Sequence, residues 1–541
     1  MHKYSKFKQS YSKILFVMLF TTSIILSYQF TYVFAQDPNT LIKHLIVIFP
    51  ENVSFDHYFA TYPNAVNPRG EPPFHAKPNT PSVNGLTATL LTDNPNSLNP
   101  FRIPRSNATT CSNDHLYTRL QEAYNGGLVN KFVETNEHLS KGYDPAITMG
   151  YFDGNTVTAL WNYAQHFSMS DNYFATTFGP STPGHINLIS GQTHGANPAY
   201  LNISDHGALT WLVSNGTLIS DPNPAYDNCP NEFTKSLPKA SMNGTNVGDL
   251  LNKANVTWGW FQGGFKPTGN TSEGDPICAS AHGLYKGVQV PDYLPHHQPF
   301  QYYKTTANPN HLPPTSVKMI GLTDQANHQY DLSDFWASAE SGNLPSVTFL
   351  KASAYQDGHA GYSNPLAEQT FLVETINRIE QLPEWNNTAI IIAYDDSDGW
   401  YDHVMPPIVS QSDNPQTDRL LGEGLCGKSA PEEYKNRCGY GPRLPFLVIS
   451  PYAKINYVDH SIIDQSSILR FIEDNWNLGR IGDQSFDAKA GSILGMFDFT
   501  SKERAQTLFL DPNMGGLITS KMTDLTNRTN QAVIDPLTEI G

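Results

Sequence analysis

The chain has 541 residues, of which 39% are hydrophobic and 16% charged, so its composition is that of a globular protein and not of a disordered one. Its formal charge of -16 argues against nucleic acid and against anionic membrane surfaces as partners. A small anionic substrate stays possible, because a bound metal ion can outweigh the overall field locally. We predict no stable protein partner.

Residues 1–35 have the pattern of a secretory signal. They carry four lysines and no acidic residue, followed by an apolar run from Ile14 to about Leu26 and small residues that end at Ala35. The segment from Ile14 to Ala35 is also just long enough to span a bilayer, so an uncleaved anchor is the alternative. We therefore expect a secreted or extracytoplasmic protein.

Cysteines and sequons agree with export. Cys426 and Cys438 close a short loop and form the most favoured disulfide, and Cys229 with Cys278 is a plausible second; the fifth cysteine is Cys111. Asn-x-Ser/Thr sequons gather between about 200 and 275. This clustering predicts an exposed, loop-rich insertion at about 196–290.

The first strong structural signal after the signal segment is the run 45–49. It is short, apolar and rich in branched residues, which predicts a buried parallel strand. It stops at Pro50 and is followed by Glu51 and Asn52, and Ser54 is predicted to cap a helix. Open α/β sheets bind their ligands at the carboxyl ends of such strands.

Later elements alternate between helix and strand. Helices are predicted within 113–133 and 366–382, a helix and turn within 156–174, and a further helix from about 181. Strands are predicted at 256–261, 347–350, 389–393 and 445–449. This alternation indicates an α/β protein with a largely parallel central sheet flanked by helices. We expect one catalytic domain over 36–500 and a tail, 501–541, packed on it.

Polar residues follow a second apolar strand in the same way. Asp395 and Asp396 come directly after the strand at 389–393, as Glu51 and Asn52 follow the first strand. Either pair alone would be an ordinary strand-end turn. Two such pairs at like positions favour a divalent metal site, because carboxylate and amide oxygens are hard ligands.

Adjacent hydroxyl residues, Ser181 and Thr182, follow Gly179-Pro180 at a predicted helix start. Pro183 suits a first helical turn, which makes Ser181 or Thr182 the predicted cap, beside unpaired backbone N–H groups. A plain cap is one interpretation. The other is a nucleophile, since a hydroxyl that touches a metal becomes partly deprotonated.

Several histidines lie beside aromatic or polar motifs. They are His115, His296, His297, His359 and His403. A single histidine is more often structural than functional. As a group they could donate hydrogen bonds to phosphoryl oxygens or protonate a leaving alcohol.

Seven sequence blocks together resemble the bacterial-type phosphoesterase family, which contains secreted phospholipases C and a branch of acid phosphatases within the alkaline phosphatase-like superfamily. The blocks, in family order over about 41–500, are "PENVSFDHYF", "NDHLYTRLQEAYNGG", "SDNYFATTFGPSTPGHINLISGQ", "LPHHQPFQYY", "DGHAGYSNP", "YDDSDGWYDHVMPP" and "CGYGPRLPFLVISPYAK". The resemblance implies an alkaline phosphatase-like fold and a small phosphate ester or phospholipid head group as substrate.

The resemblance also implies roles for individual residues. The residues that match metal-ligand positions are Glu51, Asn52, Asp395 and Asp396. Those that match the nucleophile and the histidines around the phosphate are Ser181, His115, His296, His297 and His359. Thr182 would be the nucleophile if the alignment slips by one. His403 lies in a matching segment without an assigned role. One or more divalent ions are implied, with Ca, Mg, Zn, Mn and Fe all open.

Departures from the family pattern bear on the substrate. Many phospholipases have Thr followed by a Pro-Asn-Arg run where this chain has "STPGH", and Asp-Glu-x-Gly-Gly where it has "DDSDGW". The "STPG" version and the following "LISGQTHG" are more like the acid phosphatase branch. Little chain follows residue 500, so the C-terminal lipid-binding extension of larger phospholipases is expected to be absent.

Two other functions compete with phosphoester hydrolysis. A sulfate esterase is disfavoured because the Cys/Ser-x-Pro-x-Arg motif of sulfatases lacks its arginine after Pro183. An exported binding protein with an inactive site is disfavoured because a pure scaffold needs neither a metal set nor a nucleophile.

Overall fold

A computed structural model describes residues 36–518 apart from 137–143, 198–200, 204–209, 215, 230–236, 286 and 432. The predicted signal segment 1–35 and the last part of the predicted tail, 519–541, lie outside the described residues. Within the described part of the chain, no helix has both the length and the apolarity needed to cross a bilayer.

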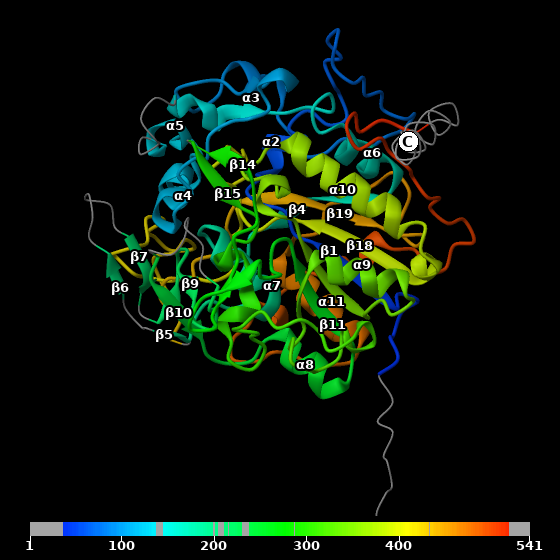
Figure 1. The fold of residues 1–541 in the computed structure, drawn as a ribbon. Helices are drawn as coiled ribbons and strands as arrows, with labels where there is room; N and C mark the ends of the chain where they lie inside the picture. The colour runs from blue at the N-terminus through cyan, green and yellow to red at the C-terminus, as the bar shows by residue number, and fades with distance from the viewer. Residues whose placement is uncertain are drawn as a thin grey trace, which may run out of the picture.

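The core of the molecule is one large mixed sheet (Figure 1). Its strands, in spatial order, are β16 (Gln329–Asp331), β11 (Trp258–Gln262), β17 (Val347–Lys351), β1 (His44–Ile48), β18 (Thr388–Ala393), β19 (Arg443–Ile449), β4 (Ser168–Phe174) and β20 (Tyr457–Asp459), and β21 (Ile463–Asp464) also pairs with β4. All pairs are parallel except those of β19 with β18 and with β4. The prediction of an α/β fold with a largely parallel sheet is confirmed.

Strands β1, β17 and β18 lie at the centre of the sheet because their side chains are apolar on both faces. Every residue of β18 is buried, and so is β1 after His44. Such runs of branched residues are typical of parallel strands that are covered on both faces. Ile48 of β1 pairs with Leu350 on one side and with Ile392 on the other. The three strands therefore end at the same edge of the sheet.

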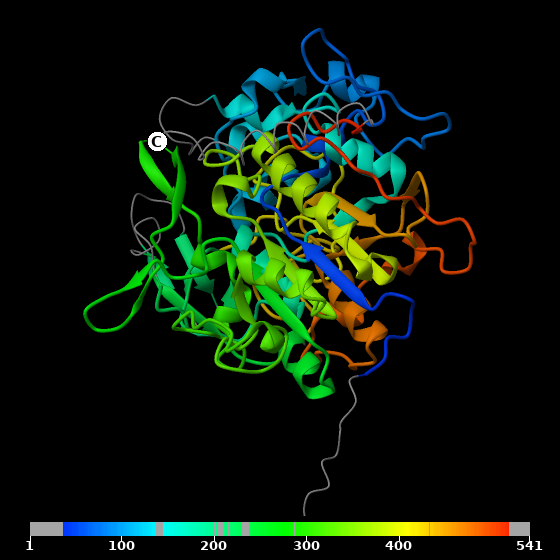
Figure 2. The same cartoon turned by 45° about the vertical axis from the view of Figure 1, so that its right-hand side comes forward.

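Helices cover both faces of this sheet (Figures 1 and 2). They are α2 (Phe55–Phe59), α3 (Ala88–Thr92), α4 (Tyr117–Tyr124), α5 (Phe132–Thr135), α6 (Thr158–His166), α7 (Ser181–Ser190), α8 (Val247–Ala254), α9 (Leu332–Glu340), α10 (Pro365–Ile379) and α11 (Gln465–Asn475). In Figure 1, α9 and α10 lie in front of the sheet, and α7 packs against α11 deeper in the view. Ser54 caps α2 through His57 N–H, as predicted.

The segment 156–174 differs from its prediction of a helix and turn. Its first half is α6, but Ser168–Phe174 forms the full strand β4. Three polar residues follow one another here, Ser170, Asp171 and Asn172, and there is no run of branched residues, so the sequence alone gives a weak strand signal. Pairing with β19 on one side and β20 on the other fixes the strand.

The region predicted as a loop-rich insertion, about 196–290, contributes mostly small sheets. Its short strands are β5 (Ala196–Asn197), β6 (Leu201–Ile203), β7 (Thr210–Ser214), β8 (Thr217–Leu218), β9 (Asn223–Pro224), β10 (Lys239–Met242), β12 (Gly269–Asn270), β13 (Pro276–Ile277), β14 (Ala281–Tyr285) and β15 (Val288–Pro291). The same region also supplies α8 and β11, a strand of the large sheet next to its edge, so part of it belongs to the core.

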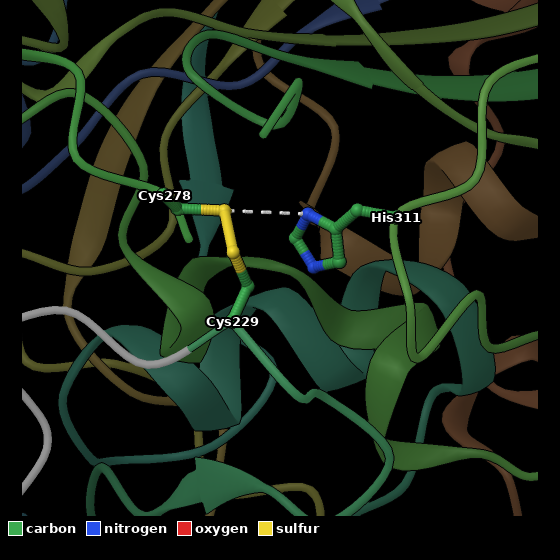
Figure 3. A group of neighbouring side chains, drawn as sticks. All are labelled: Cys229, Cys278 and His311. Atoms are coloured by element: carbon green, nitrogen blue, oxygen red, sulfur yellow. Dashed lines mark hydrogen bonds between the residues drawn. A yellow bond between two sulfur atoms is a disulfide. The ribbon is translucent and has the colours of Figure 1, made fainter. Parts of the chain in front are cut away.

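Two disulfides cross-link the chain, Cys229–Cys278 and Cys426–Cys438, and Cys111 is buried. His311 lies beside the first disulfide, with Nδ1 3.6 Å from Cys278 Sγ (Figure 3). Because the two sulfurs are bonded to each other, this group is a structural cross-link and not a metal site.

The described part of the tail lies along α10. The backbone N–H of Leu508 donates to Glu380, and that of Leu510 donates to Asn377. Leu508 and Leu510 are both buried, which ties this segment to the hydrophobic core.

Candidate active site

The ends of β1 and β18 bring together the two polar pairs that the sequence singled out. Asn52 N–H donates to Asp395 Oδ1 at 2.9 Å, and Val53 N–H donates to the Asp396 carbonyl at 2.9 Å. Asn52 has a positive φ of 61°, a conformation that asparagine tolerates better than most residues. All four side chains, Glu51, Asn52, Asp395 and Asp396, are buried.

Ser181 lies opposite these side chains at the start of α7. The structure corrects the predicted cap, because Pro180 is the N-cap and Ser181 is the first helical residue. Pro183 falls third in the helix, within the first turn as predicted, and it packs against Gly179, whose φ of 133° turns the chain into α7. This turn aims the Ser181 hydroxyl at the strand ends and away from its own helix.

The Ser181 hydroxyl is surrounded by oxygen acceptors. Its Oγ lies 3.0 Å from Glu51 Oε2, 3.2 Å from Asp396 Oδ2 and 3.3 Å from Asn52 Oδ1. One hydroxyl proton can satisfy only one of these three oxygens. In addition, Asp395 Oδ2 is buried and has no hydrogen-bond partner among the described residues.

The carboxyl groups around Ser181 are close enough to one another to shift each other's pKa. Burial, and next the neighbouring Asp395 carboxylate, raise the pKa of Glu51 and that of Asp396 well above their ordinary values. A divalent cation among these oxygens would stabilise the ionised carboxylates. The donor set of three carboxylates, an amide and a hydroxyl therefore fits a hard metal ion.

The second oxygen of Glu51 faces basic side chains of the chain itself. Lys351 Nζ contacts Glu51 Oε1 and also donates to the Phe49 carbonyl at 3.1 Å. The same Oε1 lies 3.2 Å from His297 Nδ1 and 3.4 Å from His185 Nε2. Burial is the main cause that lowers the pKa of His185 to about 3 and that of His297 well below its ordinary value.

Lys351 and His185 were missed by sequence reasoning, and the sequence carried a local signal only for His185. Lys351 ends β17, whose carboxyl end lies beside that of β1. His185 follows Ser181 by four residues on a helix, so both side chains lie on one face. His185 Nδ1 is 2.9 Å from the Ser181 carbonyl oxygen, which fixes the orientation of its ring.

The side chain of Thr182 has a different environment from that of Ser181. Its backbone N–H donates to Asp221 Oδ1 at 2.8 Å, and its Oγ1 lies 3.2 Å from the His296 carbonyl. The hydroxyl placed for chemistry is therefore that of Ser181, since it contacts the Glu51 and Asp396 carboxylates.

His115 and His359 form a second group beside the carboxylates, with ring centroids 6.3 Å apart. Burial opposes charge on His115, but Asp396 and then Asp398 outweigh it and raise its pKa to about 9. His115 Nδ1 lies 2.8 Å from the Asn113 carbonyl and 3.2 Å from Asp398 Oδ1. Burial lowers the pKa of His359 to about 3, so one of the two rings is charged and the other neutral at pH 7.

Asp398 links the two groups of side chains. Its Oδ1 accepts from Ser112 Oγ at 2.8 Å and from Asn52 Nδ2 at 3.4 Å, next to His115. Burial raises the pKa of Asp398 to about 7. This residue takes the place of a family glycine, and its φ of 49° retains the left-handed backbone that a glycine would adopt readily.

His296 and His403 complete the predicted histidines. His296 adjoins His297, with ring centroids 4.2 Å apart, and its Nδ1 has no hydrogen-bond partner among the described residues. His403 does not join the carboxylates around Ser181. It pairs instead with Asp56, at 2.6 Å from Nδ1 to Oδ2.

Close packing sets the distance between α7 and the strand ends. A β-carbon at Gly184 would collide with the backbone carbonyl of Asp395. The glycine lets the helix that carries Ser181 and His185 approach the strand that carries the aspartates. The "PSTPGH" motif thus supplies the Ser181 hydroxyl at a turn and, at Gly184, the close contact between α7 and the Asp395 backbone.

The sequence that forms this site matches the model of a known protein family. The model of the Phosphoesterase family matches residues 42–479, which is most of the chain. This chain belongs to the phosphoesterase family. Every residue of the candidate active site falls within the matched range.

Curated relatives of this phosphoesterase family chain carry phospholipase C names. It is 22% identical to non-hemolytic phospholipase C of Pseudomonas aeruginosa over 81% of this chain and 54% of the relative. It is 23% identical to phospholipase C A of Mycobacterium tuberculosis, over 82% and 77% of the two chains. It is 22% identical to non-specific phospholipase C3 of Arabidopsis thaliana, over 84% and 73%. The chain thus spans about half the length of the Pseudomonas relative.

Solved structures with partial similarity include murine ectonucleotide pyrophosphatase/phosphodiesterase 5, at 12% identity and a TM-score of 0.29 over 63% of this chain and 95% of that one. Another is the alkaline phosphatase of the Antarctic bacterium TAB5, at 7% identity and a TM-score of 0.27 over 81% and 99%. These TM-scores are low, so the description of the fold rests on the strand order and pairing of the chain itself.

Proposed function

We propose that this chain is an exported, metal-dependent phosphoesterase that uses Ser181 as its nucleophile. The observation that carries the proposal is the Ser181 hydroxyl, which lies within 3.3 Å of three acceptor oxygens at the ends of two strands. Membership of the phosphoesterase family and relatives named phospholipase C support the same reaction class.

The first step would transfer the phosphoryl group to Ser181. The Oγ atom forms a bond to phosphorus while the bond from phosphorus to the alcohol oxygen breaks. Glu51 Oε2, 3.0 Å away, is placed to accept the hydroxyl proton. Water then attacks the phosphoserine, which releases phosphate or a phosphate monoester and returns a proton to Ser181.

A proton donor is needed for the departing alcohol, and His115 has the required charge. Its raised pKa of about 9 keeps it an imidazolium near neutral pH. Its Nδ1 is engaged by Asn113 and Asp398, so Nε2 would deliver the proton. The neutral rings of His297 and His359 would donate hydrogen bonds to phosphoryl oxygens.

Glu51, Asn52, Asp395 and Asp396 would hold the metal ion. A bound divalent ion would supply positive charge to the serine oxygen and to the phosphoryl oxygens. Ca, Mg, Mn, Zn and Fe all remain candidates, because the oxygen ligands favour the first three and the neighbouring histidines suit the others.

Two substrate classes fit this chemistry. Relatives named phospholipase C favour a phosphodiester such as a phospholipid head group. The "STPG" and "LISGQTHG" motifs favour a phosphomonoester. Both classes would use the same nucleophile. They differ in the substrate, because a phosphodiester carries a second esterified group on phosphorus and a phosphomonoester does not.

The test is hydrolysis of p-nitrophenyl phosphate and p-nitrophenyl phosphorylcholine from pH 5 to 8 by the chain that starts at Gln36. Chelated and metal-restored samples are compared with Ser181→Ala, and Thr182→Ala is the matched control. We expect activity on one of the esters that needs metal and is lost in Ser181→Ala. An unchanged rate in Ser181→Ala, or no hydrolysis with any of the five metals, would refute the proposal.

A further inference from the structure

A buried cluster of charges lies behind the candidate active site and is centred on Arg443, the first residue of β19. All five guanidinium N–H groups have acceptors. Nη1 donates to the carbonyls of Asn84 and Asp171 at 2.8 and 3.0 Å. Nε and Nη2 donate to Asp402 Oδ2 at 3.2 and 3.1 Å, and Nη2 also donates to Asp56 Oδ1 at 3.1 Å. A fully buried arginine with every donor satisfied is a strong anchor.

Each of the two carboxylates also accepts a hydrogen bond from a backbone N–H of the opposite segment. Asp56 N–H donates to Asp402 Oδ2 at 3.1 Å, and His403 N–H donates to Asp56 Oδ2 at 2.9 Å. Ser54 Oγ adds a bond to the Tyr401 carbonyl at 2.9 Å. These bonds join the chain that follows β1 to the chain that follows β18.

Both joined segments begin with proposed metal ligands. Asp56 comes four residues after Asn52, and Asp402 comes six residues after Asp396. No side chain of the cluster hydrogen-bonds to Ser181 among the described residues. The direct hydrogen-bonded connection from the cluster to the site therefore runs through the two loops.

His403 completes the balance of charge in the cluster. Its Nδ1 faces Asp56 Oδ2 at 2.6 Å, and its Nε2 faces Asn84 Oδ1 at 3.2 Å. Because both partners are acceptors, the ring satisfies them only as an imidazolium, with a proton on each nitrogen. Two carboxylates then face one guanidinium and one imidazolium. Asp56, Asp402 and His403 lie close enough to ligate a metal, but the Arg443 guanidinium already lies between the carboxylates.

We propose that Arg443 and His403 are positioning residues that hold the Glu51–Asn52 loop and the Asp395–Asp396 loop together for metal binding. This inference rests on the proposed function, because that function assigns the metal ligands. Residues that orient metal ligands from behind change metal affinity by about 10- to 100-fold when they are replaced.

His403 is the residue to replace, because loss of Arg443 would leave the buried Asp402 carboxylate without its guanidinium and is expected to impair folding. His403→Leu removes the contact with Asp56. His403→Asn keeps a donor at the place of Nδ1. His460→Leu is the control: His460 Nδ1 lies 2.8 Å from Asp171 Oδ1 in a more exposed pair, and although the Asp171 carbonyl accepts from Arg443, neither residue belongs to the two loops.

The measurement is Mn²⁺ and Ca²⁺ binding to chelator-treated protein by titration calorimetry, with kcat determined as a function of metal concentration. We expect His403→Leu to weaken binding about tenfold or more, while His403→Asn and His460→Leu stay within about threefold of wild type. Excess metal should restore kcat in His403→Leu, which damage to the fold alone would not allow.

Equal affinities in wild type and His403→Leu would overturn the positioning role while leaving the proposed function intact. A similar loss in His460→Leu would also overturn it, because the effect would not be specific to the loops. If wild type binds neither ion and no metal supports activity, the proposed function fails first and this inference fails with it.

Discussion

Replacing Lys351 by methionine tests the electrostatics of the candidate site directly. The lysine side chain is 1% exposed, and its ammonium contacts Glu51 Oε1 and the Phe49 carbonyl. Methionine keeps most of the apolar length and removes only the charge and its donors. The variant therefore leaves Glu51 buried without its cation.

The expected cost follows from what remains around Glu51. His297 and His185 lie 3.2 and 3.4 Å from Oε1, but burial lowers the pKa of both rings, so neither supplies a positive charge at pH 7. Removing one partner of a buried ion pair typically costs about 3–5 kcal/mol. Because the pKa of Glu51 is already raised, its carboxyl group can take up a proton in the variant, so we expect a loss of at most this size in the free energy of unfolding of the metal-free protein.

A double-mutant cycle isolates this interaction. Glu51→Gln in the Lys351→Met background removes the unpaired carboxylate and should recover most of the loss, because the buried charge is gone. Urea unfolding at pH 7, followed by tryptophan fluorescence, gives the four free energies. Lys454→Met is the control, since Lys454 lies over the Tyr457 ring and has no carboxylate to leave behind. A Lys351→Met protein as stable as wild type, or a double variant no better than the single one, would refute the reasoning.

Three further predictions concern metal, pH and packing. Chelation should lower the melting temperature, and a divalent ion at 100 times its Kd should return about 2.7 kcal/mol. His115 should stabilise the metal-free protein fully below pH 6.5 and lose this effect as pH rises through about 9, a dependence that urea unfolding should show to be absent in His115→Asn. His185 and His359, with pKa values near 3, should instead make stability fall from pH 6.5 downward. Gly184→Ala should push α7 from the Asp395 backbone and cost about 1–3 kcal/mol, with weaker metal binding by calorimetry.

The centre of the fold could be predicted from the sequence because it depends on local pattern. The runs of branched residues that form β1 and β18 predict strands from their own sequence, without knowledge of the neighbouring strands. Glu51 and Asp395 follow shortly after these strands. Side chains at the carboxyl ends of adjacent parallel strands meet at one edge, so the oxygen-rich site followed from the pattern. Strand β4 was missed because its identity depends on pairing with β19 and β20 and not on its own residues.

The rest of the site depends on contacts between distant parts of the chain. Lys351 reaches Glu51 only because β17 is the neighbour of β1, an order that the sequence does not encode locally. The cap at α7 was misplaced because Gly179 turns the chain one residue earlier than the helix pattern suggests. His403 was noted without a role, since its partner Asp56 lies 347 residues away in the chain.

The two oxygens of Glu51 divide the site into unlike halves. On the Oε1 side, the carboxylate contacts the Lys351 ammonium, which belongs to the chain itself. On the Oε2 side, Ser181 meets further oxygens from Asn52 and Asp396 and no basic side chain within the distances described. A cation supplied from solution is needed only on the second side, which is the side of the proposed nucleophile. The same carboxylate can therefore be anchored by the fold and still take part in chemistry, because the two tasks use different oxygens.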